Sequence, residues 1–334
     1  MRKYLLPENG NFYKANLHCH STISDGKLTP EEIKQAYLAE GYSVVAFTDH
    51  EVLIPHPELT DEHFLALNGY ELSVSEPAPV GGTWKNALTC HLGFIAKSPE
   101  ITRPVCFNKN YAVSGKASVP LVDYDRSVPD YVRTYNPECI NEMLKKGREG
   151  GFYMIYNHPG WSMESAENYC HYRGMDAMEI VNYGCLVAGY EDCNPKVYDE
   201  MLFSCGKLSC VAADDNHNRI DDSCGGFVCI KAEKLEYRAV MDALEKQHFY
   251  ASTGPKIHSL YYEDGKVYIT CDNAVKITAN HGIRQAQAAY PENGALTSAV
   301  FAFVPEQKYI RITVTDATGK QAFTNAYFAE DIID

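Results

Sequence analysis

Histidine and carboxylate side chains recur along this chain in short motifs, and their types are those that bind divalent transition metals. The candidate ligands are His18, His20, Asp25, His50, Glu71, His91, His158, Asp215 and His217. Imidazole and carboxylate groups without a recruited thiolate suit Zn²⁺, Mn²⁺ or Fe²⁺. Nine such groups exceed the needs of one tetrahedral ion and suffice for two or three ions that share a bridging carboxylate. We therefore expect two to three divalent metal ions as cofactors.

The spacing of these motifs adds to the argument. Alternation along a strand places His18 and His20 on one face. His50, His158 and Asp215 each come directly after an apolar run that is typical of a buried strand. Folds that alternate strands and helices place their active sites at the carboxyl ends of their strands. Any single histidine is more often an ordinary core or surface residue, but repeated coincidence at strand ends is not expected, so the set favours a metal site.

The elements that must position these groups alternate between strands and helices for about the first 250 residues, which is typical of α/β architecture. We expect strands at 44–48, 152–156 and 208–213, and helices that begin after Thr29, Asn136, Asn194 and Glu236. We interpret residues 73–132 as long loops, because this region is rich in Pro and Gly and has no long helical pattern.

The pattern changes after residue 254. Val267, Ile269 and Cys271 alternate with polar residues, and Asp264-Gly265 and Thr318-Gly319 are typical of hairpin turns. We expect a metal-binding catalytic domain over residues 1–254 and a small antiparallel, sandwich-like β domain over residues 255–334.

Composition excludes several classes of protein. The 334 residues carry a formal net charge of −14, which disfavours a protein that coats nucleic acid. No apolar run reaches the roughly 18–20 residues of a membrane span, and the first residues lack the apolar core of a signal peptide. The twelve cysteines include no Cys-x-x-Cys pair, which favours reduced thiols. We expect a soluble, cytoplasmic protein that binds neither a nucleic-acid polymer nor a membrane; the oligomeric state cannot be inferred.

The ordered motifs resemble those of the PHP (polymerase and histidinol phosphatase) superfamily of metal-dependent hydrolases. The resemblance rests on the motifs around His18-Cys19-His20, Thr48-Asp49-His50, Tyr70-Glu71, His91, Asn157-His158-Pro159 and Asp215-Asn216-His217, and it spans about residues 12–254. The segment 249–257 and the β tail further resemble the carbaryl-hydrolase-like branch. The resemblance implies a distorted seven-stranded β/α barrel around a site for two or three metals.

The same resemblance implies a role for each ligand. His18, His20, Glu71 and Asp215 would hold one metal, and Glu71 would bridge to a second that His91 and His158 also hold. Asp25, His50 and His217 would hold a third. Many relatives have His in place of Asp25, so two metals and a hydrogen-bonding Asp25 remain an alternative.

These expectations lead to a phosphoesterase. Glu71 and Asp215 would act through a metal-activated hydroxide that attacks a small, anionic phosphomonoester. Arg219 is the first candidate for a phosphate clamp, ahead of Arg173, Lys85 and Lys116, although each is more often an ordinary surface cation. Hydrolysis of a carboxyl ester, carbamate or amide is the first alternative, and a non-catalytic metal-binding or interaction module is the second.

Overall fold

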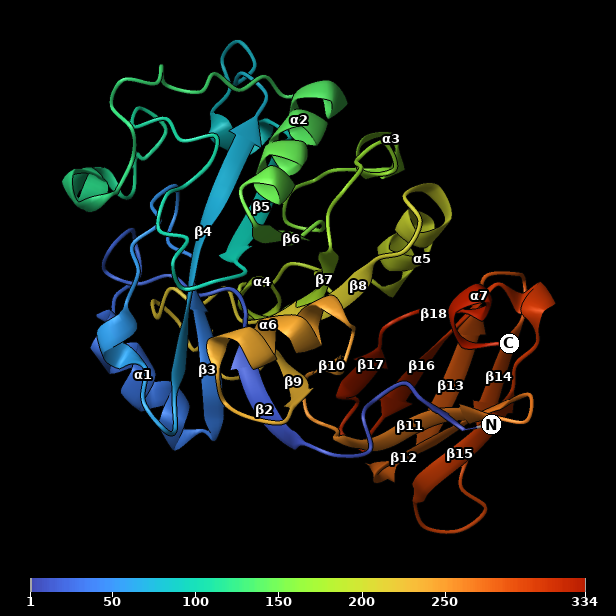
Figure 1. The fold of residues 1–334 in the computed structure, drawn as a ribbon. Coiled ribbons are helices and arrows are strands. Elements are labelled where there is room, and N and C mark those ends of the chain that lie inside the picture. Colours follow the sequence, from blue (N-terminus) through green and yellow to red (C-terminus); the bar gives the residue numbers. More distant parts are fainter. Residues whose placement is uncertain (1, 334) are drawn as a thin grey trace.

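The computed structural model describes residues 2–333, which form a mixed α/β part followed by an antiparallel β part (Figure 1). The strands of the mixed part are β2 (Asn11–Asn16), β3 (Tyr42–Phe47), β4 (Leu65–Ser75), β5 (Thr89–Ala96), β6 (Phe152–Tyr156), β7 (Ala177–Asn182), β8 (Ser209–Ala213), β9 (Phe227–Ala232) and β10 (Phe249–Ser252). Its α-helices are α1 (Pro30–Ala39), α2 (Pro137–Glu149), α3 (Ala166–Tyr169), α4 (Tyr183–Val187), α5 (Pro195–Ser204) and α6 (Tyr237–Glu245). Three short 3₁₀ helices complete it: η1 (Pro57–Leu59), η2 (Trp84–Asn86) and η3 (Lys116–Leu121).

The predicted helices and strands of this part are confirmed. The capping residues that predicted the helix starts make the expected hydrogen bonds in two of the helices. The Thr29 side chain accepts a hydrogen bond from the Glu32 amide, and Asn136 caps α2 in the same way. Helices α1, α2 and α6 pack against β3, β6 and β9, respectively. Figure 1 shows these helices along the outside of the strands. The helices thus cover the sheet and leave the strand ends for the site.

The order of strands in the large sheet determines which loops meet. The path runs β14-β13-β16-β17-β10-β9-β2-β3-β4-β5-β6-β7-β8. Strands β2, β3 and β4 are parallel, as are β6, β7 and β8, whereas β5 is antiparallel to both of its neighbours. The start of β5 therefore lies at the same edge as the ends of the parallel strands.

The prediction of continuous loops over residues 73–132 is wrong in part, because β5 lies within that region. Every residue of β5 is buried. A strand that is covered on both faces shows no alternation of apolar and polar residues, so its pattern does not stand out. The remainder of the region, after Ala96, holds only the short helix η3 and is otherwise irregular.

The seven-stranded barrel is not confirmed, whereas the mixed α/β architecture with a large sheet is. Among residues 2–333 the hydrogen-bonded path is open, because the two edges of β2 are occupied by β3 and β9 and none is left for β8. Strand β8 lies beside β9 and β10 without a ladder to either. Beyond the strands, an isolated bridge between Cys19 and Asn216 joins the segment after β2 to the segment after β8.

The β part consists of two antiparallel layers. One layer has the order β1-β11-β12-β15, with β1 (Lys3–Tyr4), β11 (Ile257–Glu263), β12 (Lys266–Ala274) and β15 (Leu296–Ala302). The other continues the large sheet through β13 (Lys276–His281), β14 (Ala286–Ala289), β16 (Tyr309–Thr315) and β17 (Gln321–Thr324), with β18 (Tyr327–Phe328) paired to β16. The 3₁₀ helix η4 (Pro305–Gln307) lies between β15 and β16, and helix α7 (Ala329–Ile332) follows β18.

Residues from both layers form one apolar core. Ile269 of β12 and Ile277 and Ile312 of the other layer belong to the same buried cluster. The predicted hairpin turn at Asp264-Gly265 is confirmed, because both residues adopt the positive φ values that a two-residue hairpin turn requires. The domain boundary at residue 254 stays a prediction. No helix within residues 2–333 has the length and apolar character that crossing a bilayer requires.

Candidate metal centre

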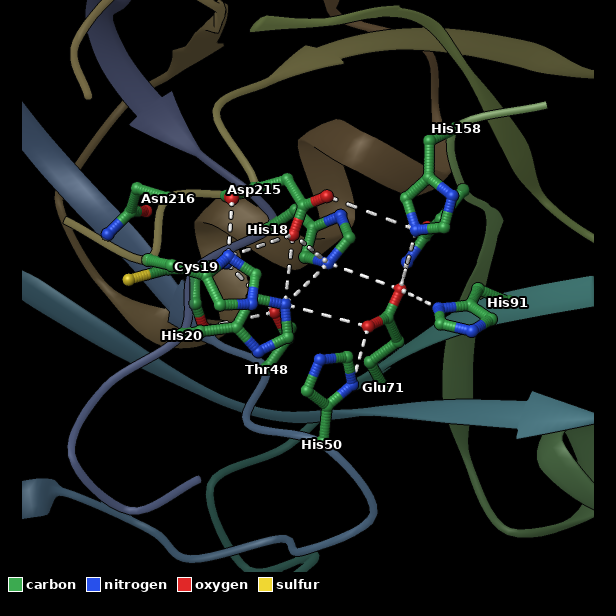
Figure 2. Close-up of polar contacts among 12 residues, drawn as sticks. His18, Cys19, His20, Thr48, His50, Glu71, His91, His158, Asp215 and Asn216 are labelled. Carbon is green, nitrogen blue, oxygen red and sulfur yellow. Dashed lines mark hydrogen bonds and ion pairs between the residues drawn. The ribbon is translucent and has the colours of Figure 1, made fainter. Parts of the chain in front are cut away.

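The nine predicted ligands lie together at one edge of the sheet. Each belongs to at least one group of three or four side chains whose ligand atoms lie within 4.8 Å of one another. Figure 2 shows Glu71 at the centre, with His91 and His158 on one side and His18, His20 and His50 on the other. The structure thus brings all nine together, while their role as metal ligands stays a prediction.

The first group contains His18, His20, Asp215 and Glu71. The Nε2 atoms of His18 and His20 are 3.0 Å apart, and Asp215 Oδ1 lies 3.1 Å from the first and 3.0 Å from the second. Glu71 Oε1 is 3.3 Å from His18 Nε2. Ligand atoms around a tetrahedral ion with bonds of 2.0–2.1 Å stand about 3.3–3.4 Å from each other. These four distances, of 3.0–3.3 Å, are therefore close to those within a tetrahedral donor set.

The second group lies on the other side of Glu71. Its Oε1 atom is 3.1 Å from His91 Nδ1 and 3.1 Å from His158 Nε2. Its Oε2 atom is 2.9 Å from His50 Nδ1. Because the carboxylate reaches imidazoles in both directions, it has the position of a bridging ligand.

The third group lies nearer the surface and contains Asp25, His50 and His217, together with His20. Asp25 Oδ1 is 3.3 Å from His217 Nε2 and 3.7 Å from His50 Nε2. The His20 ring stacks against the rings of both His50 and His217, with centroids 4.2 and 4.3 Å apart. Asp25 is therefore placed to hold an ion with the two outer histidines, or to hydrogen-bond with them.

The connections between strands explain why these groups meet. The amide of Asp215 donates to the carbonyl oxygen of His18, and the amide of His20 donates to the carbonyl oxygen of Asn216. The segments after β2 and β8 are thus bonded to each other. His158 and Asp215 have φ values of 28° and 52°, which non-glycine residues adopt only at a cost of roughly 1–3 kcal/mol. Such strain is often found where side chains must be aimed into a functional site.

Glu179, a buried residue of β7, contacts two of the histidines and was not predicted from the sequence. Its Oε1 atom is 2.7 Å from His18 Nδ1, and its Oε2 atom accepts hydrogen bonds from the His158 amide and the Asn182 side chain. A proton on Nδ1 of His18 leaves Nε2 free to bind a cation. The available signal was a lone carboxylate in the apolar run Ala177-Met178-Glu179-Ile180-Val181.

Asp49 and Asp214, which flank two of the ligands, do not orient imidazoles. Asp49 accepts hydrogen bonds from the amide and hydroxyl groups of both Ser21 and Ser24, and so it holds the loop that carries Asp25. Asp214 accepts from the Tyr37 hydroxyl and from three consecutive amides beginning at Cys224. Both carboxylates shape the loops around the cluster.

The electrostatics of the cluster favour a cation. Burial alone raises the pKa of a carboxyl group, but the neighbouring His18 and His91 outweigh it and hold the pKa of Glu71 well below its ordinary range. Burial lowers the pKa of His50, but Glu71 outweighs that effect and raises it to about 9. Burial and the neighbouring His50 lower the pKa of His20 to about 3. Burial alone also raises the pKa values of Asp25 and Asp215, but neighbouring histidines outweigh it and lower both. The three carboxylates are therefore ionised, and they draw positive charge into the site.

Buried polar atoms without a hydrogen bond support a metal at these residues. Glu71 Oε2, His20 Nδ1 and His91 Nδ1 make no hydrogen bond, although Glu71 Oε2 lies 2.9 Å from His50 Nδ1 and His91 Nδ1 lies 3.1 Å from Glu71 Oε1. Buried polar atoms without partners are costly, so each requires an explanation. Nitrogen and oxygen donors converge here, and the arginine that lies against them, Arg219, pairs with Asp25 at the outer side of the cluster. A divalent ion would satisfy several of the donors at once. The donor set therefore fits the predicted cofactors.

A pocket of about 690 Å³ opens onto the cluster. Glu71, His91, His158 and Asp215 lie on its lining, and so do both tryptophans of the chain. Arg219 also lines it, and its guanidinium donates to the Asp25 carbonyl oxygen.

Some predicted contacts lie elsewhere. The pocket lining includes none of the other candidate phosphate-binding residues, which are Arg173, Lys85 and Lys116. The histidines outside the motifs, which are His56, His63, His171, His248, His258 and His281, belong to none of the groups of candidate ligands within residues 2–333.

Comparison with known proteins finds limited likeness. No family model matches the chain. A 40-residue segment, 12% of the chain, is 48% identical to a 5′-3′ exoribonuclease from Haemophilus influenzae, of which it spans 15%. A two-domain Bacteroides vulgatus protein that contains a predicted PHP-like metal-dependent phosphoesterase matches 97% of this chain and 98% of its own, at 14% identity and a TM-score of 0.45. An amidohydrolase from Chromobacterium violaceum, with bound sulfate and no metal, matches 62% of this chain and 89% of its own, at 17% identity and a TM-score of 0.39.

Proposed function

We propose that this chain is a metal-dependent phosphoesterase of the PHP superfamily that hydrolyses a small phosphomonoester. The observation that supports this proposal most is the convergence of nine imidazole and carboxylate side chains, seven of which line one pocket. The barrel and the carbaryl-hydrolase-like branch that the motifs imply belong to the same proposal. So do a cytoplasmic location and the absence of a nucleic-acid polymer among the partners.

The charge of the filled site would attract an anion. Three divalent ions would bring six positive charges, and Asp25, Glu71 and Asp215 bring three negative ones. A unit pair about 4 Å apart contributes roughly 4 kcal/mol at an effective dielectric constant near 20, before desolvation. The chain's net charge of −14 is spread over the molecule and is screened beyond about 8 Å. The surplus of positive charge at the filled site, rather than the net charge of the chain, would therefore determine that an anionic substrate is attracted.

Bound ions would supply Lewis acidity and lower the pKa of water. The residues of the chain have separate tasks. Glu71 lies between His18 and His50 and contacts both imidazoles. Glu179 keeps His18 in the tautomer whose Nε2 faces the site. Arg219, half-exposed at the pocket, is held by Asp25 with hydrogen-bonding capacity left for a phosphoryl oxygen.

The proposal is tested with three probes on the protein reconstituted separately with Mn²⁺, Zn²⁺ and Fe²⁺. These are para-nitrophenyl phosphate, para-nitrophenyl acetate and a 5′-phosphorylated oligoribonucleotide, the last because a short segment matches an exoribonuclease. We expect metal-dependent turnover of the phosphate ester and competitive inhibition by inorganic phosphate. Glu71→Gln should lack this activity, and His63→Gln, at an exposed histidine outside the cluster, should keep it.

Other outcomes would replace the proposal. Turnover of the acetate alone would indicate a carboxyl ester, carbamate or amide hydrolase. Shortening of the oligoribonucleotide would contradict a small-molecule substrate. Metal binding without any turnover would indicate the non-catalytic module.

A further inference from the structure

Both tryptophans of this 334-residue chain line the pocket above the cluster. Trp161 lies against the candidate ligands: its ring centroid is 5.2 Å from that of His91 and 4.9 Å from that of His158, both in edge-to-face geometry. Its backbone amide donates to the buried carboxylate of Asp192, at 2.8 Å. The Trp161 ring therefore lies directly beside the candidate ligands, and the hydrogen bond to Asp192 holds its backbone in place.

The aromatic and apolar lining continues outward from Trp161. Trp84, in the turn η2, is 66% exposed, and Ile220 and Tyr190 are 50% and 48% exposed. Val113, on the irregular segment after β5, is 80% exposed. Large apolar side chains that gather at one mouth, rather than singly over a surface, indicate a binding site.

Positive charge is scarce along the same lining. Arg219 is the one lysine or arginine that lines the pocket within the described chain, and its guanidinium already donates to the Asp25 carbonyl oxygen. A second anionic group beyond the reacting one would find no further cation among the residues that line the pocket; the nearby Lys85 Nζ lies 5.6 Å from the centroid of the Trp84 ring. The outer part of the pocket therefore suits an uncharged group.

We propose that the substrate carries, beyond its reacting phosphoryl group, an uncharged aromatic group that packs between Trp84 and Trp161. This inference rests on the proposed function, because the cluster is taken to bind the phosphoryl group. Aromatic rings gain both apolar burial and favourable ring–ring geometry against tryptophan. Trp84 and Trp161 are thus specificity-determining residues.

The kinetic test compares two phosphomonoesters of primary alcohols, 4-nitrobenzyl phosphate and glycerol 3-phosphate, so that the leaving groups differ little in chemistry. We expect KM to be at least tenfold lower for the nitrobenzyl ester with the metal-reconstituted wild type. Trp84→Ala should reduce this preference to less than threefold, whereas Trp84→Phe should retain most of it. Trp84 is exposed, so neither change is expected to disturb folding. Equal KM values, or a preference unchanged by Trp84→Ala, would overturn the inference.

A binding measurement is independent of turnover. Because the chain has two tryptophans and both line the pocket, their fluorescence reports on this site. The stable analogue 4-nitrobenzylphosphonate should quench it at concentrations at least tenfold lower than free 4-nitrobenzyl alcohol requires, and methylphosphonate should leave it unchanged. Quenching without hydrolysis of any ester would support the aromatic subsite and contradict the phosphoesterase. Hydrolysis without quenching would contradict the aromatic subsite alone.

Discussion

Glu71 is the residue on which the cluster depends most. Its two oxygen atoms lie within 3.5 Å of His18, His20, His50, His91 and His158. Asn157 donates a hydrogen bond to Oε1, which fixes the carboxylate among these histidines. The negative charge of Glu71 can balance metal cations on both sides of it, whereas the neutral amide of a glutamine cannot.

Replacing Glu71 tests this role. Glu71→Gln keeps the size of the side chain and removes its charge, so we expect the loss of at least one metal per chain and a fall in phosphatase kcat of at least a thousandfold. Plasma mass spectrometry and steady-state kinetics measure the two effects. A variant with full metal content and normal kcat would show that Glu71 is not a bridging ligand.

Asp192 provides a pH-dependent prediction. Burial raises its pKa to about 6, above the value of about 3.9 that an unfolded chain gives. The folded state therefore holds the proton more tightly, and this contribution is complete below about pH 4 and lost as the pH rises through 6. Asp192→Asn retains an acceptor for the Trp161 amide and cannot ionise.

The free energy of unfolding of Asp192→Asn, relative to wild type, should accordingly increase by up to about 3 kcal/mol between pH 4 and pH 7. Urea titrations at a series of pH values measure it, and the subtraction cancels all other ionisable groups. A difference that stays constant with pH would mean that Asp192 ionises normally in the folded protein.

Most of the residues that the structure brings together in the cluster could be predicted from the sequence, because their chemistry is visible in their type. His18 and His20 are two residues apart, and their spacing needs no tertiary information. Glu179 was missed because the sequence around a single carboxylate in an apolar strand does not indicate which residues it contacts. The separation of 161 residues between His18 and Glu179 is closed only by the fold.

At the scale of elements, a buried ion pair holds the long segment between β5 and α2 over the site. The Arg133 guanidinium donates to both oxygen atoms of Glu51, at 2.7 Å each, and to the carbonyl oxygens of Ser73 and Cys106. Both charged side chains are almost completely buried. Glu51 follows the candidate ligand His50 and lines the pocket, so the pair connects this segment to the site.

Removing one partner of this pair should be costly. Arg133→Met leaves the Glu51 charge buried and unpaired, and we expect a loss of about 3–5 kcal/mol in the free energy of unfolding. Chemical denaturation measures it, with Arg126→Met as a control at an exposed arginine on the same segment. The double variant Glu51→Gln/Arg133→Met should recover part of the loss; a double variant as unstable as the sum of two independent changes would refute the coupling.

Helices and strands could be predicted where a local sequence signal marks their boundaries. Strand β5 was missed because burial alone distinguishes it. Helix α1 has a capping box at Thr29 and Glu32 and a proline at its first position. Strand β5 has no such mark, and its sequence resembles an apolar stretch of any kind. The irregular segment that follows is held by tertiary contacts such as the Glu51–Arg133 pair, which no local pattern contains.

At the scale of the whole molecule, the two parts share one sheet. Strand β10 pairs with β9 on one edge and with β17 on the other, and β1 pairs with β11. Arg311 of β16 forms a bidentate ion pair with Asp199 of α5, which joins the two parts again. The β part therefore supports the mixed part rather than being tethered to it by a linker.

A truncation tests this dependence. A chain of residues 1–254 would expose the β10 edge and lose the partners of β1, and we expect it to be insoluble or at least markedly less stable to heat than the full chain. Thermal unfolding and size-exclusion chromatography measure this. A soluble fragment with the melting temperature of the full chain would show that residues 255–334 are a separate domain.

The metal content of the reconstituted protein tests the central claim most directly. Plasma mass spectrometry should find two to three divalent ions per wild-type chain and no loss in the His63→Gln control, whose exposed histidine lies outside the cluster. Glu71→Gln should contain at least one ion fewer. Less than one ion per wild-type chain after reconstitution would contradict the account, because the convergence of nine imidazole and carboxylate side chains would then not be a metal centre.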